Sequence, residues 1–235
     1  MSVNTKNSVN YSRRERKAQR TRKRILDVAR ELFESQSYDD VKMDDISDHV
    51  DLSRATLYNY FGSKEAIYFE IGVQGLHQMN QAQLKDITED APGLELLIKL
   101  CEDAMRYLIG DPIMPEIIRR YLISNAQART PSHMIVESIR RGDAVEDTYS
   151  IILASFLQGM REYEGAWIKV IEKGYSDGSI TLDKDIEKLS HYLFMVILGM
   201  IDRIALERIV LRKIGYTDEQ IIQDTINMIR KYLTD

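Results

Sequence analysis

The amino-acid sequence predicts an all-α protein composed of a small amino-terminal three-helix unit and a larger carboxyl-terminal helical body. Glycine and proline are scarce, at 12 and 4 of 235 residues, so few positions would break a helix. Apolar residues recur at helical spacing along most of the chain, and no stretch alternates as a strand would. Basic residues are concentrated at the amino-terminal end, which sets that end apart from the rest.

The first predicted helix covers residues 16–34. Its inner stripe follows helical spacing and consists of Ile25, Val28, Ala29, Leu32 and Phe33. Residues 1–15 come before this helix and are predicted to be a disordered basic arm, because the segment is polar and has no apolar run. The same lack of an apolar run argues against a signal peptide.

Two further helices are predicted at residues 41–50 and 53–61, with a short interruption between them. Ser53 can cap the second of these helices by accepting a backbone N–H bond, and Leu57 and Phe61 turn inward at i and i+4. This arrangement is a helix-turn-helix. It completes a predicted domain of three helices that ends at residue 65.

The outward face of the helix at residues 53–61 carries side chains that can bond to phosphates and to base edges. Directly after it, Ser63 can cap a new helix whose first N–H groups, together with Lys64, would attract a phosphate. The predicted DNA-binding residues are Lys42, Arg54, Ala55, Thr56, Tyr58, Asn59, Tyr60 and Lys64.

The charge distribution supports a nucleic-acid partner although the net charge is −5. Residues 1–30 hold ten Lys and Arg against two acidic residues, a net charge of +8, and the remainder of the chain therefore carries −13. A basic run alone is often just a solvated surface. Joined to the helix-turn-helix that follows, it indicates a DNA-binding end attached to an acidic body.

The helix-turn-helix and its flanks, about 50 residues ending at Glu65, resemble the tetracycline repressor family. The family signature reads roughly T-hydrophobic-x-x-I-A and then S-x-x-T-L-Y-x-Y-F-x-x-K-E. Matching positions are Ile46, Ser53, Thr56, Leu57, Tyr58, Tyr60, Phe61, Lys64 and Glu65. Positions that depart from the usual residue are Lys42, Ser47, Asp51 and Ala55. No contact is carried over to Asp44, because the family often has a polar or basic residue there.

The resemblance implies a ligand-responsive homodimeric transcriptional repressor. Two recognition helices would enter successive major grooves of a near-palindromic double-stranded operator, with half-sites about 34–36 Å apart. A small-molecule effector between the body helices would then shift the long fourth helix, predicted at residues 64–85, and release the DNA.

The body is predicted to cover residues 66–235 and to bind ligand and dimerise. A new helix is predicted to begin after Pro92, and glycine, proline and loop segments end the predicted helices of the body. Their ranges are 94–108, 114–124, 148–173, 183–212 and 217–233, the last opened by a Thr217–Gln220 capping box. Residues 125–142 are left open, with a short helix starting at Ser132.

The last two helices are too apolar for a single buried stripe. Residues 192–201 are apolar all the way round, which indicates burial on more than one side. A central core helix in a monomer is one explanation, and a four-helix bundle across a twofold axis is the preferred one. The predicted dimer interface comprises Tyr192, Val196, Gly199, Met200, Ile222, Ile226 and Ile229.

Soft and aromatic side chains of the body suit a cavity for a flat or greasy ligand, although such residues at helical spacing are more often core. The predicted pocket comprises Cys101, Met105, Tyr121, Phe156, Met160 and Trp167. Nearby acidic residues would favour a cationic ligand, and a solvated helix face explains them equally well. They are Glu102, Asp103, Glu162 and Glu164.

No catalytic, metal-binding or cofactor motif is found in the sequence. The four histidines are scattered, and SDGSITLDKDIE fails the spacing of an EF-hand. Cys101 is the single cysteine, which excludes an intrachain disulfide and is typical of a cytoplasmic protein. The longest apolar run is about half the length needed to cross a bilayer, so no membrane span is expected.

Two other functions remain open at this point. A constitutive DNA-binding or architectural protein would share the amino-terminal domain but have no pocket, since its body would only dimerise. A helical enzyme or adaptor would carry the amino-terminal unit as a vestige. The absence of a catalytic constellation argues against the enzyme.

Overall fold

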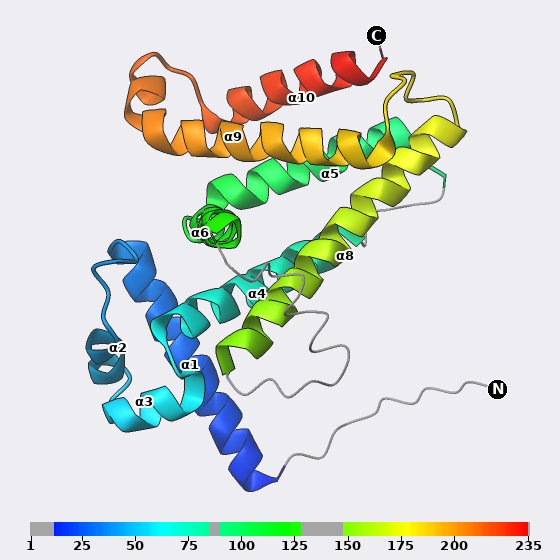
Figure 1. Cartoon of the computed structure of the whole chain (residues 1–235). Helices are drawn as coiled ribbons and strands as arrows, with labels where there is room; N and C mark the ends of the chain where they lie inside the picture. The colour runs from blue at the N-terminus through cyan, green and yellow to red at the C-terminus, as the bar shows by residue number, and fades with distance from the viewer. Residues whose placement is uncertain (1–11, 85–89, 128–147, 235) are drawn as a thin grey trace, which may run out of the picture. The chain divides into compact units, whose positions relative to one another are not determined.

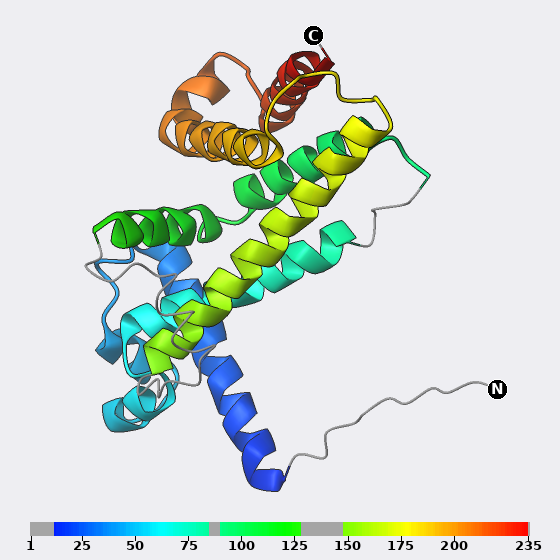
Figure 2. The ribbon, with the colours of Figure 1, turned by 45° about the vertical axis from the view of Figure 1, so that its right-hand side comes forward.

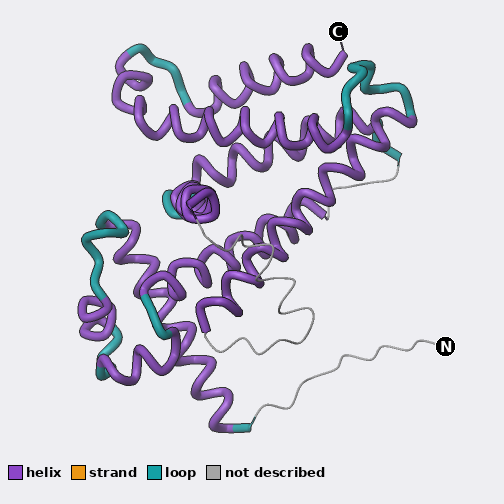
Figure 3. The backbone as a smooth tube through the Cα atoms, viewed as in Figure 1, coloured by secondary structure: helices purple, strands orange, loops and turns teal. Residues whose placement is uncertain are grey.

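The computed structural model describes residues 12–84, 90–127 and 148–234, and the regular elements in these ranges are all α-helices (Figure 3). The prediction of an all-α fold is thus confirmed for the described residues. Contacts within the chain divide it into two compact units, Met1–Tyr68 and Phe69–Asp235. None of the described helices is long and apolar enough to span a membrane.

The first unit contains three helices and the start of a fourth (Figure 1). They are α1 (Arg13–Ser35), α2 (Met43–His49), α3 (Arg54–Phe61) and α4 (Lys64–Leu84), the last of which continues into the second unit. The core of the unit includes Ile25, Leu26, Ala29, Leu32, Phe33, Val41, Ile46, Val50, Leu57 and Phe61.

The start of α1 corrects the predicted arm of residues 1–15. Ser12 accepts a hydrogen bond from the backbone N–H of Glu15, whose carboxylate accepts one from the Ser12 N–H in return. This capping box satisfies two amide groups at the helix end, so the helix begins at Arg13 rather than at residue 16. Residues 1–11 lie outside the described part of the chain.

Interactions between distant segments fix α1 and α3 relative to each other within the first unit. The Arg22 guanidinium donates to the Tyr60 carbonyl oxygen at 2.9 Å and lies 4.1 Å from the centroid of the Phe61 ring. A charge-assisted hydrogen bond combined with a cation–π contact holds the carboxyl end of α3 against α1. Arg22 therefore has a structural role within the basic helix.

The second unit consists of the rest of α4 and of the helices that follow it. They are α5 (Gly93–Gly110), α6 (Met114–Gln127), α8 (Thr148–Ser176), α9 (Ile186–Lys213) and α10 (Asp218–Thr234). Helix α5 packs against α8, α9 and α10, and α9 also contacts α6 and α8. Both ribbon views show α9 and α10 side by side, joined by a short loop (Figures 1 and 2).

Helix ends in the second unit follow local hydrogen bonding. Helix α8 continues past the predicted end at residue 173 to Ser176, and the left-handed Gly178, with φ of 72°, follows in the turn. Helix α9 begins at Ile186, because Asp185 accepts from the Lys188 N–H and caps it. The Thr217–Gln220 capping box is confirmed.

The close approach of the start of α5 to the end of α8 requires a glycine at position 93. A Cβ atom on Gly93 would lie 2.1 Å from the backbone nitrogen of Gly174, a distance that no side chain can tolerate. The Gly93 N–H donates to the Asp177 carboxylate at 2.8 Å and so anchors the start of α5 beside the end of α8. This close approach is a feature of tertiary packing that no helical pattern contains.

Candidate nucleic-acid interface and ligand cavity

The turn between α2 and α3 has the local geometry that its residues favour. Asp51 adopts a left-handed conformation with φ of 55°, which aspartate tolerates better than most residues. Ser53 accepts from the Thr56 N–H at 3.1 Å and caps α3, while Gly62, with φ of 73°, ends it. Ser63 caps α4 by accepting from the Ala66 N–H. The predicted caps are confirmed.

Helix α3 turns Leu57 and Phe61 into the core, where both are fully buried. The opposite face leaves Arg54, Ala55, Tyr58 and Asn59 exposed, and Lys42 is exposed at the start of α2; Thr56 and Tyr60 are half-buried. Lys64 is half-buried as well, so all eight predicted DNA-binding residues retain accessible surface. Contact of these side chains with DNA stays a prediction.

Lys64, the eighth, differs from the expectation of an outward phosphate-binding ammonium. Its Nζ donates to the carbonyl oxygens of Tyr38 at 2.7 Å and Val41 at 2.8 Å, and it lies 4.2 Å from the centroid of the Tyr38 ring. The Lys64 ammonium is therefore held by two charge-assisted hydrogen bonds to backbone carbonyls and by a cation–π contact. Lys64 thus ties α4 to the segment between α1 and α2.

Arg54, the first residue of α3, forms an ion pair with Asp44 of α2. Its Nη1 donates to Asp44 Oδ2 at 3.2 Å, and its Nε lies 3.1 Å from Oδ1. The guanidinium carbon is also 5.6 Å from the centroid of the Tyr58 ring. The Tyr58 side chain and, after it, the Asp44 charge raise the pKa of Arg54.

Helix α1 adds exposed cations to the same unit. They are Arg13, Arg14, Arg16, Lys17, Arg20, Lys23 and Arg24. Lys23 also pairs with Asp27 one turn later at 2.7 Å, and both side chains stay largely solvated. Such cations suit sequence-independent attraction to phosphates, which is strong at low salt and weak at high salt.

The second unit contains a cavity of about 560 Å³ bounded by α6, α8 and α9. Its lining is mostly apolar and aromatic, with a few polar groups, as is usual for small-molecule sites. The lining residues are Tyr121, Leu122, Leu157, Met160, Arg161, Tyr163, Glu164, Trp167, Ser190, His191, Phe194, Met195 and Leu198.

The predicted pocket residues divide into two groups. Tyr121, Met160 and Trp167 line the cavity. Cys101, Met105 and Phe156 are not among its lining residues and instead belong to the core, where each is fully buried. Burial raises the pKa of the Cys101 thiol far above its usual value, so this thiol is inert.

Phe156 shows why the sequence pattern alone could not separate core from pocket. Its ring packs edge-on against Phe69 and Tyr121, with centroids 5.4 and 5.6 Å away, and faces Gly72 of α4. Trp167, about three turns later on the same helix, lines the cavity although it is only 1% exposed. Both positions have the same hydrophobic spacing on α8, and only their neighbours differ.

The polar part of the cavity lies on α8 and α9. The Glu164 Oε1 atom on α8 lies 2.9 Å from the His191 Nδ1 atom on α9, and this contact connects the two helices. The Arg161 guanidinium donates to Gln158 on its own helix at 3.0 Å. The cavity thus combines an aromatic interior with one acidic and two basic side chains.

Sequence reasoning missed the α9 wall of the cavity, which is formed by Ser190, His191, Phe194, Met195 and Leu198. The available signal was the all-round apolar segment of residues 192–201, which was assigned to a dimer interface. In the structure this segment has three faces. Leu193, Ile197 and Ile201 enter the core, Phe194, Met195 and Leu198 line the cavity, and Tyr192 and Gly199 are exposed.

The predicted dimer interface needs a correction on α10. Ile222, Ile226 and Ile229 are buried within the chain itself, where α10 packs on α5. On α9, Tyr192 and Gly199 are exposed and Val196 and Met200 are half-buried. The exposed apolar surface extends further along α9 than predicted, through Leu206, Ile209 and Val210 to the C-cap residue Ile214. Met228 of α10 is exposed as well.

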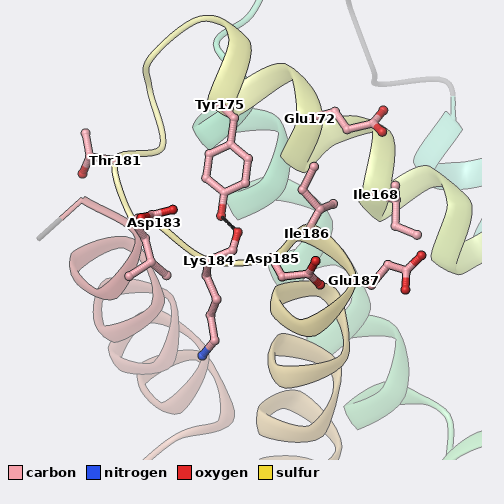
Figure 4. Close-up of a pocket in the computed structure, with 10 residues that line it drawn as sticks. Ile168, Glu172, Tyr175, Thr181, Asp183, Lys184, Asp185, Ile186 and Glu187 are labelled. Carbon is pink, nitrogen blue, oxygen red and sulfur yellow. Dashed lines mark hydrogen bonds between the residues drawn. The ribbon is translucent and has the colours of Figure 1, made fainter.

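A second hollow, of about 670 Å³, is lined by the last turns of α8, the loop that follows them and the start of α9 (Figure 4). Its carboxylates come from Glu172, Asp183, Asp185 and Glu187. The Tyr175 hydroxyl donates to the Lys184 carbonyl at 2.7 Å, and the Lys184 ammonium extends away to donate to the Tyr232 hydroxyl. Asp185 is occupied as the cap of α9, and the described residues contain no cluster of side chains that could hold a metal ion.

Comparisons with known proteins agree with this geometry. The family model for bacterial regulatory proteins of the tetR family matches residues 25–71, which span α1 to the first part of α4. The chain carries a TetR-family DNA-binding domain. Over 147 residues it is also 26% identical to the HTH-type transcriptional regulator TcmR of Streptomyces glaucescens. That match covers 60% of this chain and 62% of TcmR, which is less than two thirds of that regulator.

Solved structures extend the likeness beyond the TetR-family domain. The TetR-family regulator PfmR from Thermus thermophilus has a TM-score of 0.61 at 20% identity, covering 90% of this chain and 100% of that one. FadR from Bacillus subtilis, solved with stearoyl-CoA, has a TM-score of 0.61 at 16% identity, covering 91% and 97%. A regulator from Saccharomonospora viridis, solved with choline, has a TM-score of 0.63 at 17% identity. That match again covers 91% of this chain and 97% of the other. At these identities the likeness shows the fold alone.

Proposed function

We propose that this protein is a homodimeric transcriptional repressor that binds a palindromic operator and leaves it when a small molecule occupies the cavity of the second unit. The observation that carries the ligand response is the cavity itself. A constitutive DNA-binding protein would need no aromatic space of about 560 Å³ between the helices of its body. The proposal includes no catalytic step and places the protein in the cytoplasm, with its operator.

The TetR-family domain supports the DNA-binding part. The exposed face of α3 offers donors for base edges, and the exposed cations of α1 offer charge for phosphates. Two copies of α3 related by a twofold axis would occupy major grooves about one helical turn apart. Binding should therefore require an operator with two matching half-sites.

The surface of α9 supports the homodimer. Leu206 is 79% exposed and Ile209 is 73% exposed, and Val210 and Ile214 continue the same surface. A run of large exposed aliphatic side chains on one helix is typical of an interface rather than of a solvated surface. A second copy of this chain, paired across a twofold axis, would cover it.

The lining of the cavity suggests what the effector is and how it acts. Aromatic walls with few polar groups suit a largely apolar ligand that contains an aromatic or other flat portion. Among the residues that line the cavity, none lies on α4, whereas five lie on α9. Because α9 also carries the proposed dimer surface, a ligand would first change the pairing of the two copies and thereby the spacing of the two α3 helices.

A ligand titration tests the response directly. Trp167 is the single tryptophan and lines the cavity, so its fluorescence should change in a saturable way when a ligand binds. A panel of flat aromatic compounds, with stearoyl-CoA and choline as further members, should contain at least one such ligand. The same compound should release the protein from DNA that flanks its own gene in an electrophoretic shift.

The same two measurements separate the alternatives. DNA binding without any saturable ligand, and without any change on ligand addition, would favour the constitutive DNA-binding protein. Ligand binding without DNA binding would favour an adaptor or enzyme. Met160→Phe, which adds volume to the cavity from α8 and keeps Trp167 as the single tryptophan, should weaken the fluorescence response if the ligand occupies that space.

A further inference from the structure

The ion pair between Asp44 and Arg54 connects the two helices of the helix-turn-helix at the point where α3 begins. It joins the second residue of α2 to the first residue of α3 across the turn. Both side chains are more than half exposed, at 54% for Asp44 and 62% for Arg54. An ion pair this exposed adds little to stability, so its main effect is on the orientation of the arginine.

Arg54 is constrained from two sides. Asp44 engages its Nη1 at 3.2 Å, and the Tyr58 ring lies 5.6 Å from its guanidinium carbon. A guanidinium has five N–H donors in a rigid fork, of which a guanine needs two for its O6 and N7 acceptors. The hydrogen bond to Asp44 therefore leaves enough donors for a bidentate contact with a base.

The position of Arg54 is the one from which a recognition helix contacts base edges, because the amino-terminal residues of such helices enter the major groove first. An unconstrained arginine on the surface would have to lose several rotamers on binding. The carboxylate that holds it in place removes part of that cost before DNA arrives.

We propose that Arg54 recognises a guanine in each half-site and that Asp44 is the positioning residue that determines this preference. The inference rests on the proposed function, since it presumes that the α3 face binds DNA. Beyond that function, it assigns a specific base to Arg54 and a positioning role to Asp44, which itself contacts no base. Asp44 acts through Arg54, and its own negative charge mildly opposes phosphate binding.

A selection of bound sequences from a randomised duplex library tests the proposal. The set comprises wild type, Arg54→Ala, Arg54→Lys, Asp44→Asn and the control Asp48→Asn. Asp48 is exposed one turn further along α2 and carries the same charge, so its variant reproduces the charge change without the ion pair. Affinity for a random duplex is measured alongside, at two salt concentrations.

The wild type should enrich guanine at two symmetry-related positions. Arg54→Ala should lose that preference by about 5- to 150-fold, because alanine has no side-chain donor. Arg54→Lys should keep part of it, because lysine can donate to the guanine O6 and N7 but lacks the planar fork. Asp44→Asn should lower it by about 2- to 12-fold, the range expected for one side chain that must be ordered on binding. Asp48→Asn should keep it, and both asparagine variants should bind random DNA no more weakly than wild type.

Each other result overturns the inference. If Asp44→Asn retains the guanine preference of Asp48→Asn, Asp44 does not position Arg54. If the positions lost in Arg54→Ala are not guanines, Arg54 recognises another feature. If Asp44→Asn lowers affinity for the selected sequence as much in the Arg54→Ala background as in the wild type, Asp44 acts independently of Arg54. A wild type that enriches no sequence would overturn the proposed function as well, and only that result would do so.

Discussion

The α2–α3 face and the cavity of the second unit hold their side chains in different ways. On the face, Arg54, Tyr58 and Asn59 are exposed, and the backbone beneath them is fixed by helix caps and two buried apolar anchors. In the cavity, Tyr163 and Trp167 are almost fully buried and form part of the packing that joins α8 to α9. Side chains of the face can therefore change without loss of the fold, whereas those of the cavity contribute both to binding and to stability.

The largest expected difference between the two regions is in stability. Phe156→Ala removes a fully buried ring that contacts two other aromatic side chains, and it should cost about 3–5 kcal/mol in the free energy of unfolding. Asn59→Ala on the exposed face should change it by less than about 0.5 kcal/mol. Urea unfolding followed by circular dichroism measures both. Equal losses in the two variants would show that the face is not independent of the fold.

The close approach of α5 and α8 sharpens the comparison within the second unit. Gly93→Ala would place a methyl group against the backbone of Gly174, which cannot give way, and should destabilise the protein by about 1–3 kcal/mol. Gly110→Ala at the other end of α5 meets no atom within 4 Å and serves as the control. If both variants unfold at the same urea concentration as wild type, the crossing is looser than the structure indicates.

Lys64 and Lys17 provide a similar contrast inside the first unit. Lys64→Met leaves two carbonyl oxygens without their charged donor and should cost about 1–3 kcal/mol in stability. Lys17→Met should leave stability unchanged and, if that ammonium contacts a phosphate, flatten the salt dependence of DNA binding by about 0.9 in log–log slope. Thermal unfolding and binding at several salt concentrations measure the two effects. A Lys64 variant as stable as the Lys17 variant would restore the outward, phosphate-binding interpretation of Lys64.

Assembly is expected to depend on single exposed residues of α9. Leu206 is exposed in the single chain, so Leu206→Glu should fold normally and yet prevent a second copy from covering the surface. Leu206→Met keeps an apolar side chain of similar volume and should keep the dimer. Sedimentation at low micromolar concentration distinguishes the two. A wild type that sediments as a monomer would contradict the proposed dimer outright.

The smallest expected effect is a pH dependence from the pairing of α5 with α10. The hydrogen bond from Arg230, with Nη2 2.9 Å from Glu95 Oε2, lowers the pKa of Glu95 from its usual value. A carboxyl group with a depressed folded pKa stabilises the protein above its unfolded pKa, and this contribution is lost as the pH falls through the folded value. The pair is exposed, so the contribution is only about 0–1 kcal/mol.

Glu95→Gln should therefore be slightly less stable than wild type at neutral pH and equally stable in acid below that pKa. In a protein that already carries Arg230→Gln, the effect of Glu95→Gln on stability should be smaller over the same pH range, because the partner of the Glu95 carboxylate is gone. Urea midpoints from neutral pH down to about pH 3 are the measurement. A difference that persists unchanged at the acid end would assign the effect to packing rather than to charge.

Local rules allowed much of the first unit to be predicted from the sequence. The caps at Ser53 and Ser63 and the inward Leu57 and Phe61 all follow from hydrogen bonds and spacing within a few residues. The start of α1 was missed although its signal is equally local, since Ser12 and Glu15 have the spacing of a capping box. Contacts over longer distances, such as Lys64 with Tyr38, were not predictable in this way.

What the sequence determined by itself was the helical class, the helix-turn-helix and the residues exposed on α3, because each depends on interactions along the chain. Only the tertiary structure decided which apolar residues of the body form the core and which form a cavity. Phe156 and Trp167 have the same spacing on α8, and Ile226 and Leu206 look equally suited to an interface, yet their surroundings differ. The physical reason is that burial depends on which helices meet at a residue, and that depends on contacts between segments far apart in the chain.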